Sequence, residues 1–397
     1  MTSVDIIGGV YREICRFPSW DQIYGSGGRA AAALSNYFDE VRLHTFVSDA
    51  EKQDTLATIE SFGVKVDPRS SDNLVSFEYL HCLSTPSIEP TSWKLGEGSN
   101  FAVEAEFAVV FGMMEAVPPV VAKKCVYDPQ SAYEPLPFSK TGSRADRLAI
   151  VCNRSELRMM TGSDNESAAI SFLKAENAEV VVVKCGLSGA RVFTDDGEQC
   201  QIPAYKCSDV FLIGSGDVFT AAFSLGWAEL GMSPKDAADY ASKAVSRYAE
   251  TKVLPIVHPN DVSSVSWDPA ILKGGKVYLA GPFRELGQRV LIEEARKHLK
   301  QIGFSVFSPV HDIGHGPAEV VVSKDLDAIV EADLVFAILN GSSPGTLFEV
   351  GYAKALGKPV YCLAQNMRDQ DIKLPVGSGC VIKDDMVSLI HEMSWRA

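Results

Sequence analysis

Residues 334–364 read LVFAILNGSSPGTLFEVGYAKALGKPVYCLA, and this stretch decides the fold of the chain around it. An apolar run (334–339) enters a Gly/Ser/Pro turn, a helical pattern rich in Ala and Leu follows (346–357), and a second apolar run closes the unit (359–364). Two buried strands joined by a helix are typical of a parallel sheet, because parallel neighbours need a long crossover connection. The stretch therefore predicts an α/β fold.

The same alternation extends over most of the chain, with one interruption. Strand and helix patterns alternate from residue 4 to about 250 and again from residue 276 onward, which favours two mainly parallel sheets. The interruption, HPNDVSSVSWDPAILKGG, is rich in Pro, Ser, Asp and Gly and has no periodicity. We therefore predict one domain at residues 1–257, a linker at 258–275, and a smaller, doubly wound domain at 276–397.

The composition is that of a globular protein and excludes several classes of function. The chain has 397 residues and a net charge of −14, which leaves no basic surplus for a nucleic-acid backbone. Its nine cysteines are scattered without a C-x-x-C pair, so we expect reduced thiols and no metal site built from protein ligands alone. The N-terminus lacks a signal-peptide pattern and no apolar run reaches 18 residues, so we expect a cytoplasmic protein that does not bind a membrane.

One carboxylate of the opening stretch, Glu349, has two interpretations. Thr346-x-x-Glu349 is a capping-box pattern ahead of an apolar run, so this carboxylate could simply cap the helix. The same position lies beyond the carboxyl end of a strand, where open α/β sheets bind their ligands. There a helix N-terminus could hold a carboxylate nucleophile and depress its pKa. Both interpretations place Glu349 in the first helical turn.

Two further motifs accompany this helix in a fixed order. They are YLAGPF (278–283) and D-x-x-x-I-x-x-x-D (325–333), followed by GTLFEVGYAKALGKPV (345–360). Together they resemble the nucleoside 2-deoxyribosyltransferase family and the related nucleoside 5′-monophosphate N-glycosidases. The resemblance implies that Glu349 attacks the anomeric carbon of the sugar, that Asp325 holds the substrate, and that Tyr278 orients the glutamate. N-glycoside cleavage passes through an oxocarbenium-like state, which a nearby carboxylate stabilises or captures.

One position separates the two branches of this resemblance. The transferases usually carry Asp six residues before the nucleophile, where this chain has Ser343. A serine, an arginine fork and loop amides suit a 5′-phosphate, whereas an aspartate would repel it. Hydrolysis of a nucleotide is therefore favoured, and base transfer stays an alternative. The substrate- and phosphate-binding residues that the resemblance implies are Gly281, Arg284, His311, Asp333, Ser343 and Gly345.

In the N-terminal part, LIGSGDVFTAAFSL (212–225) places small residues and Asp217 at the start of an apolar helix. Glycines let backbone amides approach a phosphate, and an aspartate there can take a proton from a hydroxyl. A turn with an Asp N-cap would look the same, but the flanking motifs resemble ribokinase-like (PfkB) carbohydrate and nucleoside kinases over most of residues 4–250. Those motifs are GSGGRAAAALS (25–35), NRSELRMMTG (153–162) and VVVKCGLSGARVF (181–193).

This second resemblance implies a ribokinase-like α/β/α domain ahead of a flavodoxin-like one, with ATP and Mg²⁺ as cofactors and Asp217 as the base. The other residues that it implies are Gly214, Ser215 and Gly216 as an anion hole, Asn153 and Glu156 near the metal and phosphates, Lys184, Gly186 and Gly189 at the nucleotide, and Gly27 and Gly28 on the acceptor side.

The chain departs from these kinases on the acceptor side. They usually have Asp soon after the first strand, where this chain has Tyr11-Arg12-Glu13, and an Asn after the Gly-Gly pair, where it has alanines at 30–33. The lid segment between Gly9 and Gly27 also looks short. An active kinase with an unusual acceptor and a non-catalytic nucleotide sensor both stay open.

The favoured hypothesis is a bifunctional enzyme of nucleoside or nucleotide metabolism that acts on small molecules, with no nucleic-acid partner. The glycosidase resemblance also implies a homo-oligomer. A binding module whose carboxylates are only helix caps is the remaining alternative.

Overall fold

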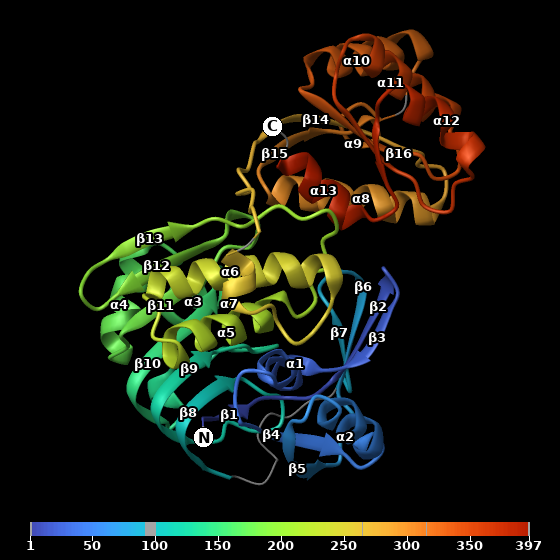
Figure 1. Cartoon of the computed structure of the whole chain (residues 1–397). Helices are drawn as coiled ribbons and strands as arrows, with labels where there is room; N and C mark the ends of the chain where they lie inside the picture. The colour runs from blue at the N-terminus through green and yellow to red at the C-terminus, as the bar shows by residue number, and fades with distance from the viewer. Residues whose placement is uncertain (1, 92–100, 264, 315, 396–397) are drawn as a thin grey trace. The chain divides into compact units, whose positions relative to one another are not determined.

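The computed structural model describes residues 2–91, 101–263, 265–314 and 316–395. They divide into two compact units, Met1–Ala270 and Ile271–Ala397 (Figure 1). Each unit is built on a largely parallel sheet with helices on it, so the predicted α/β class is confirmed. The segment predicted as a linker includes a short helix, α7 (Pro259–Ser263), and Ser264 in that segment lies outside the described residues.

The N-terminal unit contains a nine-stranded sheet in the order β13-β12-β11-β10-β9-β8-β1-β4-β5. The strands from β11 to β5 pair in parallel, and β12 and β13 add an antiparallel edge. Their apolar runs are buried on both faces, as a parallel sheet between helices requires. The strands are β1 (Ser3–Ile7), β4 (Glu40–Ser48), β5 (Lys65–Ser71), β8 (Val103–Phe111), β9 (Val120–Asp128), β10 (Arg144–Asn153), β11 (Val180–Lys184), β12 (Ala190–Thr194) and β13 (Gln199–Ile202).

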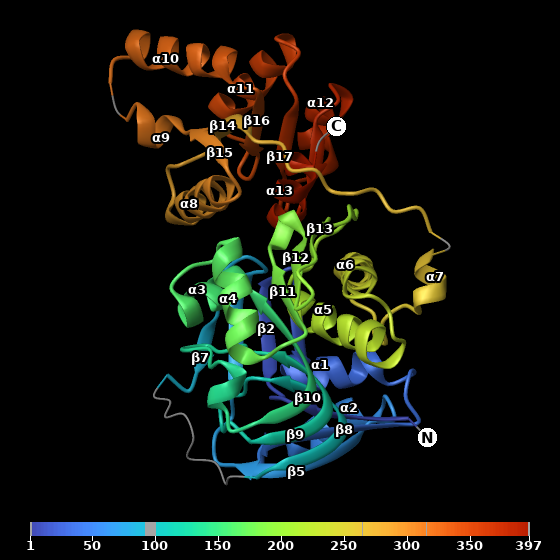
Figure 2. The same cartoon turned by 90° about the vertical axis from the view of Figure 1, so that its left-hand side faces the viewer.

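Helices cover both faces of this sheet (Figure 2). The views place α1, α5 and α6 on one face and α3 and α4 on the other. A π-helical turn (Leu225–Glu229) follows α5 directly, so the apolar helix that starts near Asp217 does not stay a regular α-helix. No helix in the described part of the chain combines the length and apolarity needed to cross a membrane. The helices are α1 (Gly25–Leu34), α2 (Lys52–Glu60), α3 (Arg154–Thr161), α4 (Glu166–Glu176), α5 (Ser215–Ser224) and α6 (Pro234–Thr251).

A second, four-stranded sheet in the order β3-β2-β6-β7 belongs to the N-terminal unit. The lid segment that was predicted to be short, between Gly9 and Gly27, contributes β2 and β3, and a later segment contributes β6 and β7. These strands are mostly half-exposed and lack the continuous buried run that marks a core strand, so their pattern gave little signal. They are β2 (Arg12–Phe17), β3 (Trp20–Ile23), β6 (Ser76–His81) and β7 (Ser87–Glu89).

The C-terminal unit contains five parallel strands in the order β15-β14-β16-β17-β18, which confirms the predicted doubly wound sheet. The strand order reverses between β14 and β16, so the loops after these two strands lead to opposite faces and leave a crevice between them. The strands are β14 (Gly275–Ala280), β15 (Phe304–Phe307), β16 (Leu334–Ile338), β17 (Val360–Leu363) and β18 (Val381–Lys383).

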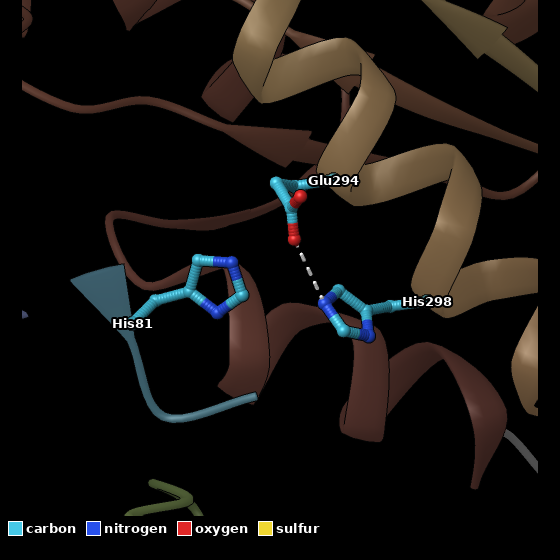
Figure 3. A group of neighbouring side chains, drawn as sticks. All are labelled: His81, Glu294 and His298. Carbon is cyan, nitrogen blue, oxygen red and sulfur yellow. Dashed lines mark hydrogen bonds and ion pairs between the residues drawn. The ribbon is translucent and has the colours of Figure 1, made fainter. Parts of the chain in front are cut away.

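Two hydrophobic clusters hold this sheet between its helices. One joins it to α8 and α13, and the other joins it to α10 and α11. On α8, Ile292, Ala295 and Leu299 face the sheet, while Glu294 and His298 pair one turn apart with 3.2 Å between Oε2 and Nε2 (Figure 3). The helices are α8 (Leu286–Gln301), α9 (Pro309–Asp312), α10 (Ala318–Glu331), α11 (Pro344–Ala355), α12 (Asp369–Gly377) and α13 (Met386–Ser394).

Candidate active sites

Glu349 meets Tyr278 at the carboxyl edge of the C-terminal sheet. Tyr278 lies on β14 and is fully buried, and its Oη donates a 2.9 Å hydrogen bond to Oε1 of Glu349 on α11. The helix α11 follows β16, so the pair stands where the strand order reverses. Open α/β sheets bind their ligands at this point, which makes the pair the centre of a candidate site.

The helix-cap interpretation of Glu349 is wrong. The helix α11 begins at Pro344, with Ser343 as its N-cap residue, and no side chain caps it. Proline favours the first helical position because its missing N–H would have had no partner there. This start is two residues earlier than predicted, so Thr346 is in the first turn and Glu349 is in the second. The carboxylate of Glu349 accepts from a tyrosine instead of a backbone amide.

Burial raises the pKa of Glu349 to about 7. The hydroxyl of Tyr278 lowers this pKa because it donates to the charged form, and the nearby Asp325 raises it again. The predicted depression by the helix dipole was therefore wrong. A dipole acts mainly within the first turn, and the removal of water outweighs it here. The group is poised between its two protonation states at neutral pH.

Asp325 is a second carboxylate that acts on the Tyr278 hydroxyl. It lies in the middle of α10, so it does not begin its helix. Within the described residues its buried Oδ1 accepts no hydrogen bond. Burial raises the pKa of Asp325, and Tyr278 partly offsets that rise. A buried acceptor without a partner is uncommon, and it leaves an oxygen available to a hydroxyl or N–H of a substrate.

The loop after β14 starts close to the end of β16. A Cβ on Gly281 would lie 3.2 Å from Cβ of Ile338, the last residue of β16, which is a tight contact that glycine avoids. Arg284 lies exposed in that loop. In the loop after β16, Ser343 makes no capping bond, and Gly345 follows it at the open N-terminus of α11. Such a helix start attracts anions, because its first amides have no partner in the helix.

Two predicted substrate-binding residues are engaged elsewhere. His311, in α9, places Nε2 at 2.8 Å from Oε1 of Glu293 and Nδ1 at 3.0 Å from the hydroxyl of Ser308. Asp333 precedes β16 and accepts a 2.7 Å hydrogen bond from the backbone amide of Lys276, just after the start of β14. The amino ends of parallel strands lie opposite their carboxyl ends, so the structure does not bring Asp333 to Glu349.

The glycine loop of the N-terminal unit opens α5. Gly214 is the N-cap residue, with φ of 76°, a conformation that glycine adopts without strain. Ser215 and Gly216 begin the helix, and Asp217 is buried in its first turn. A Cβ on Gly216 would lie 3.5 Å from Nζ of Lys184, so the ammonium group stands beside the helix N-terminus. The amide of Ser215 already donates to the carbonyl of Leu212 at 3.0 Å, so the amides of Gly214 and Gly216 are the ones that suit a phosphate next to this fixed cation.

A buried aspartate that the sequence analysis missed supports this cation. Asp128, at the end of β9, accepts from Nζ of Lys184 at 2.5 Å and from the hydroxyl of Thr220 at 2.7 Å through Oδ2. Its Oδ1 is buried and accepts no hydrogen bond within the described residues. Burial raises the pKa of Asp128, and Lys184 opposes that rise. The available signal was its position at the end of a predicted strand.

Asn153 and Glu156 lie at the carboxyl end of β10, where α3 starts. They form a reciprocal capping box at the start of α3, with Asn153 as the N-cap. Burial, followed by the charge of Asp128, raises the pKa of Glu156 to about 7. Both residues therefore support the helix, and Glu156 also faces the cavity that contains Asp217.

Both carboxylate oxygens of Asp217 accept hydrogen bonds. The guanidinium of Arg29 donates to Oδ2 at 2.8 Å, and Nε2 of Gln130 donates to Oδ1 at 2.5 Å. Arg29 is fully buried and also donates to both carboxylate oxygens of Glu13. The sequence analysis missed these partners, because an arginine beside a run of alanines gives no sign of which carboxylates it will meet.

The predicted glycines of the acceptor side serve packing. A Cβ on Gly27 would lie 2.6 Å from the carbonyl carbon of Gly8, and one on Gly28 would lie 2.9 Å from Cδ1 of Ile59. Gly25 and Ser26, two residues earlier in α1, line the cavity.

The predicted nucleotide glycines both adopt positive φ, 56° at Gly186 and 78° at Gly189. A Cβ on Gly189 would lie 1.9 Å from the carbonyl oxygen of Ile202, so this position also requires glycine for a close backbone approach.

Two family models match separate parts of the chain in the predicted order. Residues 145–251 match the pfkB family carbohydrate kinase model, and residues 277–387 match the nucleoside 2-deoxyribosyltransferase model. The chain therefore carries a pfkB-type kinase segment followed by a nucleoside 2-deoxyribosyltransferase-type segment.

Curated relatives match part of the chain. The 5-dehydro-2-deoxygluconokinase of Listeria monocytogenes serotype 4a is 34% identical over 125 residues, which are 30% of this chain and 37% of the relative. The enzyme of the same name from Bacillus subtilis is 29% identical over 113 residues, 27% of this chain and 34% of the relative. The chain thus spans little more than a third of the length of these relatives.

Among solved structures, a fructokinase from Vibrio cholerae covers 66% of this chain and 98% of its own, at 12% identity and a TM-score of 0.49. A ribokinase from Thermotoga maritima covers 66% of this chain and 99% of its own, at 16% identity and a TM-score of 0.46.

Proposed function

We propose that the C-terminal unit cleaves the N-glycosidic bond of a nucleoside 5′-monophosphate, and that the N-terminal unit is an ATP-dependent kinase for a nucleoside or sugar. The observation that carries the first part is the Tyr278–Glu349 hydrogen bond of 2.9 Å at the point where the strand order reverses. A buried carboxylate held by a tyrosine is oriented as an attacking group needs to be.

In this proposal Glu349, as the carboxylate, attacks the anomeric carbon while the base departs. The glycosyl–enzyme bond is then broken by water, and the products are the free base and a sugar phosphate. Asp325 offers its unpaired Oδ1 to a polar hydrogen of the substrate. The open start of α11, with Ser343, and the exposed Arg284 provide groups of the kind that bind the 5′-phosphate.

The N-terminal unit offers groups that suit ATP and a divalent cation. The amides of Gly214 and Gly216 and the ammonium of Lys184 would face phosphate oxygens. The buried Oδ1 of Asp128 and the carboxyl of Glu156 are hard oxygen ligands of the kind that Mg²⁺ prefers, so the residues fit the ion. Mg²⁺ would neutralise negative charge on the phosphates. Asp217 would then take the proton of the acceptor hydroxyl.

Release of free base tests the glycosidase proposal. A panel of nucleosides and their 5′-monophosphates would be incubated with the full chain and followed by chromatography. We expect free base from a monophosphate, and a loss of at least about a thousandfold in E349Q, because the amide cannot form the glycosyl–enzyme bond. The control variant E331Q changes an exposed glutamate of the same unit and should release base like the wild type.

A new nucleoside formed when a second base is added would instead support base transfer. Equal base release by E349Q and the wild type would contradict the proposal.

The hydrogen bonds on Asp217 favour a second candidate for the N-terminal unit. Arg29 donates to one carboxylate oxygen of Asp217 and Gln130 donates to the other. Such contacts fit a catalytic base, and they equally fit an aspartate that only supports the structure of a nucleotide sensor. Consumption of ATP with each acceptor of the panel separates the two. A kinase loses turnover in D217N, whereas a sensor binds ATP in both proteins without acceptor-dependent turnover.

A further inference from the structure

Two groups of side chains line the cavity of the N-terminal unit, whose volume is about 490 Å³. One group is polar and includes the carboxylates Glu13, Glu156 and Asp217. The other group is apolar or aromatic. Among the described residues that line the cavity, none is a lysine, an arginine or a histidine. The apolar group comprises Tyr11, Phe77, Tyr79, Ile88, Met113 and Met114.

The apolar group forms a fixed surface. Tyr11, Phe77, Ile88 and Met114 belong to one packed cluster, and the rings of Tyr11 and Phe77 are 5.4 Å apart between centroids. The hydroxyl of Tyr11 donates to Oε2 of Glu115 at 2.7 Å and accepts from the backbone amide of Met114 at 2.7 Å. Two hydrogen bonds therefore hold this ring in place before any ligand arrives.

The charges of the cavity disfavour an anionic acceptor. Arg29 is fully buried behind Gly214 and shared between Glu13 and Asp217, so those three groups together keep a net negative charge. Lys184 is paired with Asp128 and stands beside the phosphate-binding helix start. A carboxylate or phosphate on the acceptor would meet like charges, and the described residues of the cavity wall offer it no free cation.

We propose that the acceptor is an unphosphorylated nucleoside, with its base against Tyr11, Phe77 and Met114 and a sugar hydroxyl towards Asp217. This inference rests on the proposed kinase function of the N-terminal unit. The volume falls in the usual range of small-ligand sites, and a flat base covers an aromatic surface that a bare sugar would leave exposed to water. The charge of the described lining residues disfavours sugar acids and sugar phosphates, including the acid in the names of the Listeria and Bacillus relatives.

The transfer step balances with ATP as the second reactant. The nucleoside hydroxyl oxygen forms a bond to the γ-phosphorus, and the bond from that phosphorus to the β–γ bridging oxygen breaks. The hydroxyl proton passes to Asp217, and ADP leaves with the electron pair of the broken bond. The product is a nucleoside monophosphate, which is the class of substrate that we propose for the C-terminal unit.

Calorimetric titration of the full-length chain tests the acceptor class. The protein carries E349Q, so that bound nucleosides are not cleaved, and the probes are adenosine, uridine, ribose, gluconate and fructose 6-phosphate. We expect at least one nucleoside to bind about tenfold or more tightly than ribose, because stacking of one base on aromatic side chains has about this effect. Because the C-terminal unit can also hold a nucleoside or a phosphate, each titration is repeated with F77A added, and only binding that F77A weakens is assigned to the N-terminal cavity. Gluconate and fructose 6-phosphate should show no binding that depends on Phe77. F77A-sensitive binding of either anion that is tighter than that of the nucleosides, or no F77A-sensitive binding of either nucleoside, overturns the inference.

A pair of variants on β6 locates the base. F77A should weaken nucleoside binding about tenfold and leave ribose unchanged, whereas L80A, which removes an exposed side chain of the same strand, should change neither. Equal effects of F77A and L80A on nucleoside binding would show that the base does not lie against Phe77. If F77A fails to fold, the comparison of the five probes with the unsubstituted cavity still tests the acceptor class. Phosphoryl transfer is measured separately. Nucleoside binding without phosphoryl transfer would reject the kinase function and keep the nucleoside as the ligand. Phosphoryl transfer to gluconate would keep the kinase function and reject the nucleoside as the acceptor.

Discussion

At the scale of single residues, Glu349 is subject to opposing influences. Burial and Asp325 favour its neutral form, and the hydroxyl of Tyr278 favours its charged form. The balance leaves the pKa at about 7, well above that of an exposed glutamate. Only the charged form can attack a sugar carbon, so the proposed activity depends directly on this balance.

We expect base release to increase with pH through about 7, because the fraction of Glu349 in the carboxylate form increases there. Tyr278 lowers this pKa, so its removal in Y278F should move the acid limb of kcat/KM to higher pH, by about one unit for one lost hydrogen bond. The measurement is a pH–rate profile on the monophosphate. The control is Y352F on α11, the helix that carries Glu349. It keeps an aromatic ring stacked on Phe348 and should leave the acid limb of the profile at the same pH. An unmoved limb in Y278F would contradict the role given to Tyr278.

At the scale of elements, the start of α11 determines where an anion can bind. Ser343 precedes Pro344, and the side chain of Ser343 leaves the first helical amides without a partner. Because α11 starts at Pro344, Glu349 lies in its second turn, where it contacts Tyr278 of β14. The N-terminus of the helix has no side-chain cap. One element thus presents the proposed nucleophile and the proposed phosphate site.

S343D separates these two functions of α11. Aspartate caps helices as well as serine does, so the helix start should persist. Its charge would repel a bound phosphate, and we expect kcat/KM for the monophosphate to decrease at least about tenfold while that for the bare nucleoside changes little. S305D adds the same charge at an exposed position of β15 and serves as the control. An equal loss for both substrates would place the phosphate elsewhere.

At the scale of the whole molecule, the chain divides at Ala270–Ile271, and each unit has hydrophobic clusters of its own. Neither proposed site includes a residue from the other unit. The two chemistries should therefore be separable by single substitutions in the intact protein.

We expect D217N to abolish acceptor-dependent ATP consumption while base release from monophosphates stays within about twofold. E349Q should abolish base release and leave ATP consumption within about twofold, since independent sites behave additively. Both rates are measured on the same preparations of the full chain. If D217N also slows base release from a monophosphate, the N-terminal unit regulates the C-terminal one, as the sensor hypothesis requires.

The sequence by itself determined the elements, their order and the α/β class. Residues 334–364 alone predict strand, turn, helix and strand, because periodicity and Gly/Pro turns are local properties. The motifs also placed Glu349 beyond the carboxyl end of a strand and Asp217 at the start of a helix. The sequence did not determine the four-stranded sheet, whose short strands lack a buried run, or the exact start of α11, which lies at Pro344.

Only the tertiary structure decided what surrounds the two carboxylates. Tyr278 and Glu349 are 71 residues apart, and Arg29 and Asp217 are 188 residues apart, so no local pattern reveals their contacts. The pKa of Glu349 follows from burial, which depends on how β14, α10 and α11 pack. Periodicity determines elements because it is local, whereas charge and protonation depend on water exclusion and on partners that meet only in the folded chain.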